Sequence, residues 1–149
     1  MQSHIENIPT LSVVYMRRIG SYGEQNYKLM QDMKQWVQNQ NLWNENGIIY
    51  GIAQDNVAVT PPDDCRYDVC FVTDSTFEDN AINYGKLPSG TYLVFEIPHT
   101  AEEVQRFWGS LGEKLAKEEK QLDDSRPILE RYQIALVEKG FCEFCVPIL

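Results

Sequence analysis

The chain has 149 residues, of which 43% are hydrophobic and 23% charged, so it is long enough and apolar enough to bury a core of its own. Its formal net charge of −9 argues against a nucleic acid as direct partner, because binding to a phosphate backbone depends largely on Lys and Arg. The sequence opens without the basic and apolar stretches of a signal peptide, and no apolar run approaches the ~20 residues of a membrane span. We therefore expect a cytoplasmic protein that has no membrane partner.

The first predicted elements are a strand and a helix within residues 13–37. The segment from Val13 to Ile19 has the composition of a strand, and apolar residues then recur at intervals of three and four from Leu29 to Val37. That spacing is typical of an amphipathic helix. Ser21, followed three residues later by an acid, resembles a capping box at its start. Two further strand-like runs follow at 47–54 and 65–73, with a turn-rich segment between them.

The second half of the chain repeats this order of elements. Residues 91–115 align with 13–37 as a strand and an amphipathic helix, and Thr100 with Glu103 forms a second potential capping box. Two more strands are predicted at 127–137 and 141–148, joined by a tight turn. The segment 74–90 between the halves is expected to be a loop, with an embedded short strand as the alternative.

Two copies of β-α-β-β predict an α+β fold with antiparallel sheets, each covered on one face by its own helix. We expect a single domain over 1–149, with repeat one at about 9–73 and repeat two at about 88–149. An approximate two-fold axis would relate the repeats around a central ligand cleft.

Glu130 is the candidate site residue that the strand pattern singles out. Alternation within its strand places Glu130 on the same face as Tyr132, Ile134 and Leu136, so a carboxyl group lies among aromatic and aliphatic side chains. The alternative is an acid at a strand edge that pairs with Arg131 or another surface cation. If the carboxylate is desolvated, its pKa should rise, which would also suit a general acid or base.

Aromatic residues supply the other candidate ligand contacts. Trp108 lies on the apolar stripe of the second helix, where it either packs in the core or forms a stacking wall for a flat ligand. Tyr132 shares the face of Glu130, and Tyr50, at the matching place in the first half, is expected to face Glu130 across the two-fold axis. Tyr92 is a strand aromatic for which ligand contact is the less favoured interpretation.

The last strand of each half carries one acid, and the two acids occupy corresponding positions. Arg66 and Asp68 lie two residues apart on one face of their strand, which favours a local ion pair. Asp68 corresponds to Glu143 in the second half, so an acidic rim of the cleft is the alternative.

The sequence predicts neither a metal site nor a bound cofactor. The four cysteines are expected to be buried free thiols. A zinc site is the alternative, but Cys142 and Cys145 lie three apart in a strand and should point to opposite faces. His4 and His99 do not form a ligand cluster, and His99 is expected in the turn between a strand and the second helix.

Six short motifs follow one another in a recognisable order from about residue 9 to the C-terminus: "VVYMRRIGSY", "YGIAQDNV", "CRYDVCFV", "LPSGTYLVFE", "PILERY" and "CEFCVPI". Together they resemble the GyrI-like small-molecule-binding family, whose domains also form the effector-binding halves of AraC-type and MerR-type transcription regulators. The resemblance implies two β-α-β-β units around a cleft that takes hydrophobic, often cationic or planar compounds. It also implies that Glu130 is the buried glutamate of the family, that Glu143 is a second acid found in some multidrug-binding members, and that Trp108 is the helix aromatic.

The resemblance leaves three functions open. The leading expectation is a stand-alone domain that binds a small hydrophobic or cationic ligand, either to sequester a toxin or to report the ligand to a regulator protein. No helix-turn-helix segment is recognised before residue 9, so a one-component transcription factor is not expected. The alternatives are a hydrolase that opens strained cyclopropane rings with Glu130 as the catalytic group, and a protein that protects DNA gyrase and contacts it through 83–92.

Overall fold

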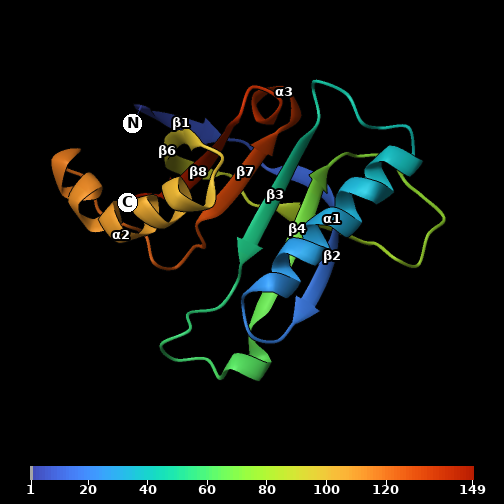
Figure 1. The fold of residues 1–149 in the computed structure, drawn as a ribbon, viewed down its shortest axis with the longest axis horizontal. Helices are drawn as coiled ribbons and strands as arrows, with labels where there is room; N and C mark the ends of the chain where they lie inside the picture. Colours follow the sequence, from blue (N-terminus) through green and yellow to red (C-terminus); the bar gives the residue numbers. More distant parts are fainter. Residues whose placement is uncertain (1) are drawn as a thin grey trace.

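The strands form one antiparallel sheet, and its two long helices lie on one face of it (Figure 1). The computed structural model describes residues 2–149, and the order of its eight strands is β1-β6-β8-β7-β3-β4-β2-β5. Its elements are β1 (Gln2–Ile8), β2 (Leu11–Ile19), α1 (Glu24–Asn39), β3 (Ile48–Ala53), η1 (Pro62–Asp64), β4 (Arg66–Val72), β5 (Asn83–Leu87), β6 (Gly90–Pro98), α2 (Ala101–Lys117), β7 (Leu129–Gln133), α3 (Ile134–Val137) and β8 (Phe141–Pro147).

The two predicted β-α-β-β repeats are present, and they pair with each other through the strand that follows the helix in each repeat. β2, α1, β3 and β4 form the first repeat, and β6, α2, β7 and β8 form the second. β3 pairs with β7 in the middle of the sheet, with Gly51 opposite Glu130. The predicted fold class is confirmed, although the two expected sheets are halves of one continuous sheet.

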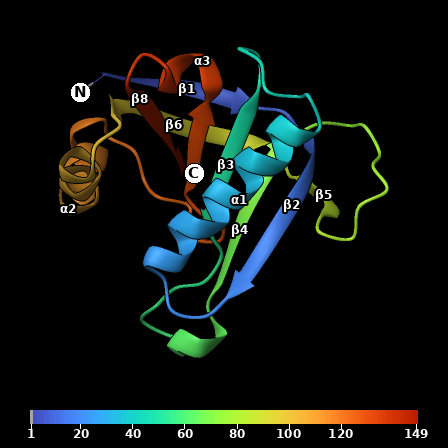
Figure 2. The same ribbon diagram turned by 45° about the vertical axis from the view of Figure 1, so that its right-hand side comes forward.

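α1 packs its apolar stripe against the first repeat. Met30, Met33, Trp36 and Val37 are buried on this stripe, and they contact side chains of β2, β3 and β4. Both views show α1 crossing in front of β4 (Figure 1, Figure 2). The indole Nε1 of Trp36 also donates to the Asp79 carboxylate at 2.8 Å, which fixes the loop after β4 to the helix.

α2 packs in the same way against the second repeat. Phe107 is fully buried and stacks on Phe144 of β8 with ring centroids 4.3 Å apart. The predicted cap at its start is confirmed, because the Thr100 hydroxyl accepts a hydrogen bond from the Glu103 amide. The corresponding prediction for α1 is wrong: Gly23 is the N-cap there, and no side chain caps the helix.

The other face of the sheet buries a third cluster, drawn from both repeats. Tyr50, Ile52 and Cys70 from the first repeat meet Leu129 and Cys145 from the second. Strand alternation produces this division, because neighbouring residues of β3 and β7 point to opposite faces.

At the edges of the sheet the structure adds one strand and confirms another. β1 forms one edge, where the sequence predicted no element. The embedded short strand that was the alternative for 74–90 is confirmed as β5, so 83–92 is only partly a loop. β7 ends at Gln133, where the chain turns into α3, so Ile134 and Leu136 do not continue the strand face of Glu130.

In the part of the chain that the structure describes, neither long helix has the length and apolar character to span a bilayer.

Candidate functional site

A hollow of about 230 Å³ lies between α1, the central strands and the turn before α2. Glu130 and Tyr132 of β7 line it, together with Tyr67 of β4. α1 contributes residues one turn apart, as expected for one flank of a helix. The full lining is Asn26, Tyr27, Met30, Gln31, Lys34, Tyr67, His99, Glu130 and Tyr132.

Glu130 is held by two tyrosine hydroxyls. Tyr67 and Tyr132 each donate a hydrogen bond to its Oε1 atom, both at 3.0 Å. Gly51 lies opposite Glu130 on β3, and a Cβ atom at Gly51 would lie 2.8 Å from that carboxylate oxygen and closer still to the Tyr67 hydroxyl. A glycine at this position therefore gives the three polar groups room to meet.

Burial raises the pKa of Glu130, and the hydrogen bonds from the two tyrosines only partly oppose this rise. Among the described residues, no cation lies close enough to lower the pKa of this carboxyl. The pKa values of Tyr67 and Tyr132 are raised as well, mainly by burial and then by the neighbouring Glu130 charge. Both phenols therefore stay protonated and remain donors at neutral pH.

Lys34 and His99 bring basic side chains to the same hollow. Lys34 comes from α1, and burial lowers the pKa of its ammonium group. His99 lies in the turn between β6 and α2, as predicted, and its ring is 5.4 Å from that of Tyr132. Burial and the nearby Lys34 charge lower the pKa of His99, so its imidazole is mostly neutral at pH 7.

Of the six site residues predicted from the sequence, two line the hollow: Glu130 and Tyr132. Trp108 does not line it: its indole packs on Phe107 and Phe144 and is 45% exposed. Since Phe144 pairs with Glu130 across β8 and β7, Trp108 lies to the side of the hollow. Trp108 therefore packs against the core, as one of the two interpretations predicted, but it also remains partly exposed to solvent.

Tyr50, Tyr92 and Glu143 lie on the face of the sheet away from the helices. Tyr50 is buried opposite Arg131, so the expectation that it faces Glu130 is wrong. Tyr92 is buried in the same cluster. The prediction for Tyr50 fails by one residue, because Gly51 and not Tyr50 pairs with Glu130. In a strand, a shift of one position moves a side chain to the other face.

Glu143 belongs to a buried ion cluster on that second face. The Arg131 guanidinium donates to both carboxylate oxygens of Glu143, at 2.9 and 3.0 Å, and also to Glu6 of β1. The pKa of Glu6 falls to about 2, chiefly because Arg131 donates a hydrogen bond to it. Arg131 therefore points away from Glu130, which excludes the alternative that these two neighbours form a pair.

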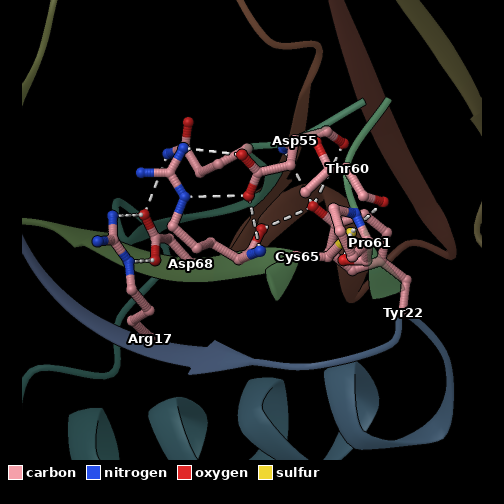
Figure 3. Close-up of polar contacts among 9 residues, drawn as sticks. Arg17, Tyr22, Asp55, Thr60, Pro61, Cys65 and Asp68 are labelled. Atoms are coloured by element: carbon pink, nitrogen blue, oxygen red, sulfur yellow. Dashed lines mark hydrogen bonds and ion pairs between the residues drawn. The ribbon is translucent and has the colours of Figure 1, made fainter. Parts of the chain in front are cut away.

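The predicted ion pair between Arg66 and Asp68 is not formed. Asp68 instead accepts from Arg17 at 2.6 and 2.8 Å (Figure 3), and from Gln54 at 3.0 Å. Arg66 turns to Asp55 in the loop after β3, at 2.9 Å. These contacts hold the end of the first repeat together, and they lie away from the hollow.

The four cysteines are buried free thiols, as predicted. Within residues 2–149, no three His, Cys, Asp or Glu side chains come together in a way that could hold a metal ion.

The other seven lining residues were not identified as ligand contacts from the sequence, and Lys34, Tyr67 and His99 are the chemically important ones among them. Tyr67 had a detectable signal, because alternation along β4 places it on the helix face. Lys34 and His99 had none, since one lies on a helix flank and the other in a turn, and only the tertiary fold brings them to Glu130.

Comparison with known proteins agrees with this architecture. The model of the GyrI-like small molecule binding domain matches residues 1–149. The chain is 39% identical over 150 residues to the Bacillus subtilis (strain 168) protein named "SPbeta prophage-derived putative transcriptional regulator YosT", and the match covers 99% of both chains.

Solved structures with the same fold include a ligand complex and part of a protein in complex with DNA. The EcmrR C-terminal domain has a TM-score of 0.73 at 15% identity, covering 99% of this chain and 97% of that one. In the EcmrR–DNA complex the match, at the same TM-score and identity, spans 57% of the longer EcmrR chain. SAV2435 bound to tetraphenylphosphonium has a TM-score of 0.66 at 18% identity, covering 100% of this chain and 94% of that one. By its match over the whole sequence, the chain belongs to the GyrI-like small-molecule-binding domain family.

Proposed function

We propose that the chain binds a hydrophobic cation in the hollow between α1 and the central strands, with Glu130 as its counter-charge. The observation that carries the proposal is a carboxyl group whose only side-chain hydrogen bonds within the described chain come from two neutral phenols. Removing a carboxylate from water is unfavourable unless an opposite charge compensates. An incoming cation supplies that charge, and its binding restores the ionised form of Glu130.

The walls of the hollow suit a flat or aromatic cation. Tyr67 and Tyr132 present ring surface beside the carboxyl group, and Met30 adds an adaptable apolar contact from α1. A cation held against tyrosine rings gains cation–π attraction as well as the charge interaction. The tetraphenylphosphonium complex of SAV2435 shows a hydrophobic cation bound to a protein of this fold, which supports the same ligand class here.

The biological use we propose is ligand sensing or sequestration. The relative named as a "putative transcriptional regulator", and the same fold in the DNA-bound EcmrR, support sensing, in which occupancy of the hollow is reported to a regulator. Sequestration would need no partner and only a ligand affinity high enough to lower the free concentration of a toxin.

A fluorogenic styrylpyridinium dye tests the proposal. The N-methylated dye is a planar cation, and the parent styrylpyridine is the same shape without the permanent charge. We expect the cation to bind and Glu130→Gln to weaken its binding at least about tenfold, since contacts to a charged group contribute about 1.5–3 kcal/mol. Binding of the neutral parent, measured above its own pKa, should change little.

Glu138→Gln is the matched control, because it makes the same change at an exposed carboxylate after α3. Equal loss of affinity in both variants, or an unchanged affinity in Glu130→Gln, would contradict the assignment of the site. Mass spectrometry of a cyclopropane-bearing compound after incubation would detect hydrolysis, and a ring-opened hydrate that requires Glu130 would replace binding by catalysis.

A further inference from the structure

The hollow contains a second charge, opposite in sign to that of Glu130. Lys34 lines it from α1, one turn after Met30. Burial lowers the pKa of Lys34, and no neighbouring carboxylate among the described residues opposes this by raising it. Lys28 on the same helix differs, since it is largely exposed and has Asp32 at 3.7 Å. Lys34 is therefore a partly buried cation that no described acid neutralises.

Contacts between side chains give the order of the groups in the hollow. Glu130 accepts from Tyr132, and the ring of Tyr132 lies against that of His99. His99 in turn lies close enough to Lys34 for the ammonium charge to lower the pKa of its imidazole. Glu130 and Lys34 both line the hollow, yet neither belongs to an ion pair within 4.0 Å among the described residues. The two charges are therefore separate groups of one hollow, linked by contacts through Tyr132 and His99.

The rest of the lining is more polar than a site for a purely hydrophobic cation requires. Asn26 and Gln31 place side-chain amides on the α1 wall, and Gln31 lies one helical turn before Lys34. A ligand that carried only positive charge would meet Glu130 favourably and Lys34 unfavourably. A ligand with an anionic group at its other end would satisfy both.

We propose that the hollow selects zwitterionic amphiphiles: the cationic centre of the ligand contacts Glu130, and an anionic group, a carboxylate, sulfonate or phosphate, contacts Lys34. This inference rests on the cation site proposed above and specifies its ligand class. Lys34 is then a specificity-determining residue, because it disfavours simple cations as well as attracting the anionic end of the correct ligand. The neutral His99 imidazole and the Gln31 amide supply further hydrogen-bond donors to the anionic group.

A matched pair of dyes tests this inference. The N-methyl styrylpyridinium is a simple cation, and its N-sulfopropyl analogue carries the same chromophore with an added sulfonate. Fluorescence titration at pH 7 should show the wild-type protein binding the zwitterion about fivefold more tightly, the size expected of a solvent-accessible charge pair near 1 kcal/mol. Glu130→Gln should weaken both dyes.

Variants at Lys34 should change the two affinities in opposite directions. Lys34→Met should weaken the zwitterion and strengthen the cation, whereas Lys34→Arg should keep the preference for the zwitterion. A general loss of structure would lower both affinities together, so the opposite signs separate a charge effect from misfolding. Lys28→Met, the same change on the exposed side of α1, should leave both affinities as in the wild type.

The outcomes distinguish this inference from the cation site on which it rests. If both dyes bind with equal affinity and Glu130→Gln weakens both, the cation site stands and zwitterion selection is wrong. Zwitterion selection is also wrong if Lys34→Met shifts both affinities in one direction. If neither dye binds below millimolar, or if Glu130→Gln has no effect, the cation site itself is refuted and the zwitterion inference with it.

Discussion

Gly51→Ala should disrupt the site without touching the ligand directly. The added methyl group would lie 2.8 Å from the Glu130 carboxylate and closer still to the Tyr67 hydroxyl, so one of these groups must move. Tyr67 is 4% exposed and its ring is packed in the α1 cluster, which leaves it little room. We expect the hydrogen bond between Tyr67 and Glu130 to be lost.

The size of the effect follows from opposing contributions. Overpacking a tight site costs about 1–3 kcal/mol, and a lost hydrogen bond to a charged group costs about 1.5–3 kcal/mol. The two overlap, because the same displacement causes both. Replacing a strand glycine offsets about 0.5–1 kcal/mol. We expect a net loss of about 1–3 kcal/mol, or roughly 3–10 °C in Tm for a chain of this length.

A double-mutant cycle with Tyr67→Phe measures the effect most sharply. In the wild-type background, Tyr67→Phe removes one of the two donors to Glu130 and should destabilise the protein. In the Gly51→Ala background, the same change removes the oxygen that the methyl group meets, so it should be neutral or stabilising. Urea unfolding should give a coupling of at least about 1 kcal/mol. Additive effects would refute the proposed contact among Gly51, Tyr67 and Glu130.

Further expected outcomes concern charge and thiol chemistry elsewhere in the fold. Because the pKa of Glu130 is raised, ionisation of Glu130 destabilises the folded protein as the pH rises through that pKa. The stability of Glu130→Gln relative to the wild type should therefore be greater near pH 8 than near pH 4, and a difference in urea midpoints that does not change with pH would contradict this. Arg131→Met should destabilise the protein by about 3–5 kcal/mol, since it leaves Glu143 buried without its cationic partner and with only the Gln133 amide as a donor. The double variant Arg131→Met with Glu143→Leu should recover much of that loss in urea unfolding, and no recovery would argue against the buried pair. The thiols of the native protein should react slowly with Ellman's reagent and rapidly in denaturant, because burial raises the pKa of Cys70, Cys142 and Cys145 to about 12. Fast labelling of the native protein would show instead that the strands carrying these cysteines open readily.

The order of elements could be predicted from the sequence because the doubled pattern is local. Helical spacing identifies α1 and α2, and alternation identifies the inner strands. β1 could not be predicted, since only Ile5 and Ile8 are apolar within it and its position depends on pairing with β6. β7 was predicted to be longer than it is, because Ile134 and Leu136 continue the apolar alternation although the backbone there turns into α3.

The site was predictable only where one strand contains it. Glu130 and Tyr132 lie two residues apart, so alternation alone places them together. Tyr50 was assigned to the wrong face because the pairing of β3 with β7 is a long-range register that internal alignment fixes only to within a residue. Lys34 and His99 reach the hollow from separate elements, so their proximity to Glu130 depends on how α1 and the turn before α2 pack.

The carboxyl resonance of Glu130 provides the most direct test of the central claim. Carbon-detected NMR of the protein labelled at glutamate carboxyls would follow the pKa of this group with and without the styrylpyridinium cation. We predict a pKa above the usual range of glutamate in the free protein, because burial raises it, and a lower pKa in the complex, because a nearby cation favours the ionised form. A pKa that does not change when the dye binds would show that the cation lies elsewhere and would contradict the proposed role of Glu130.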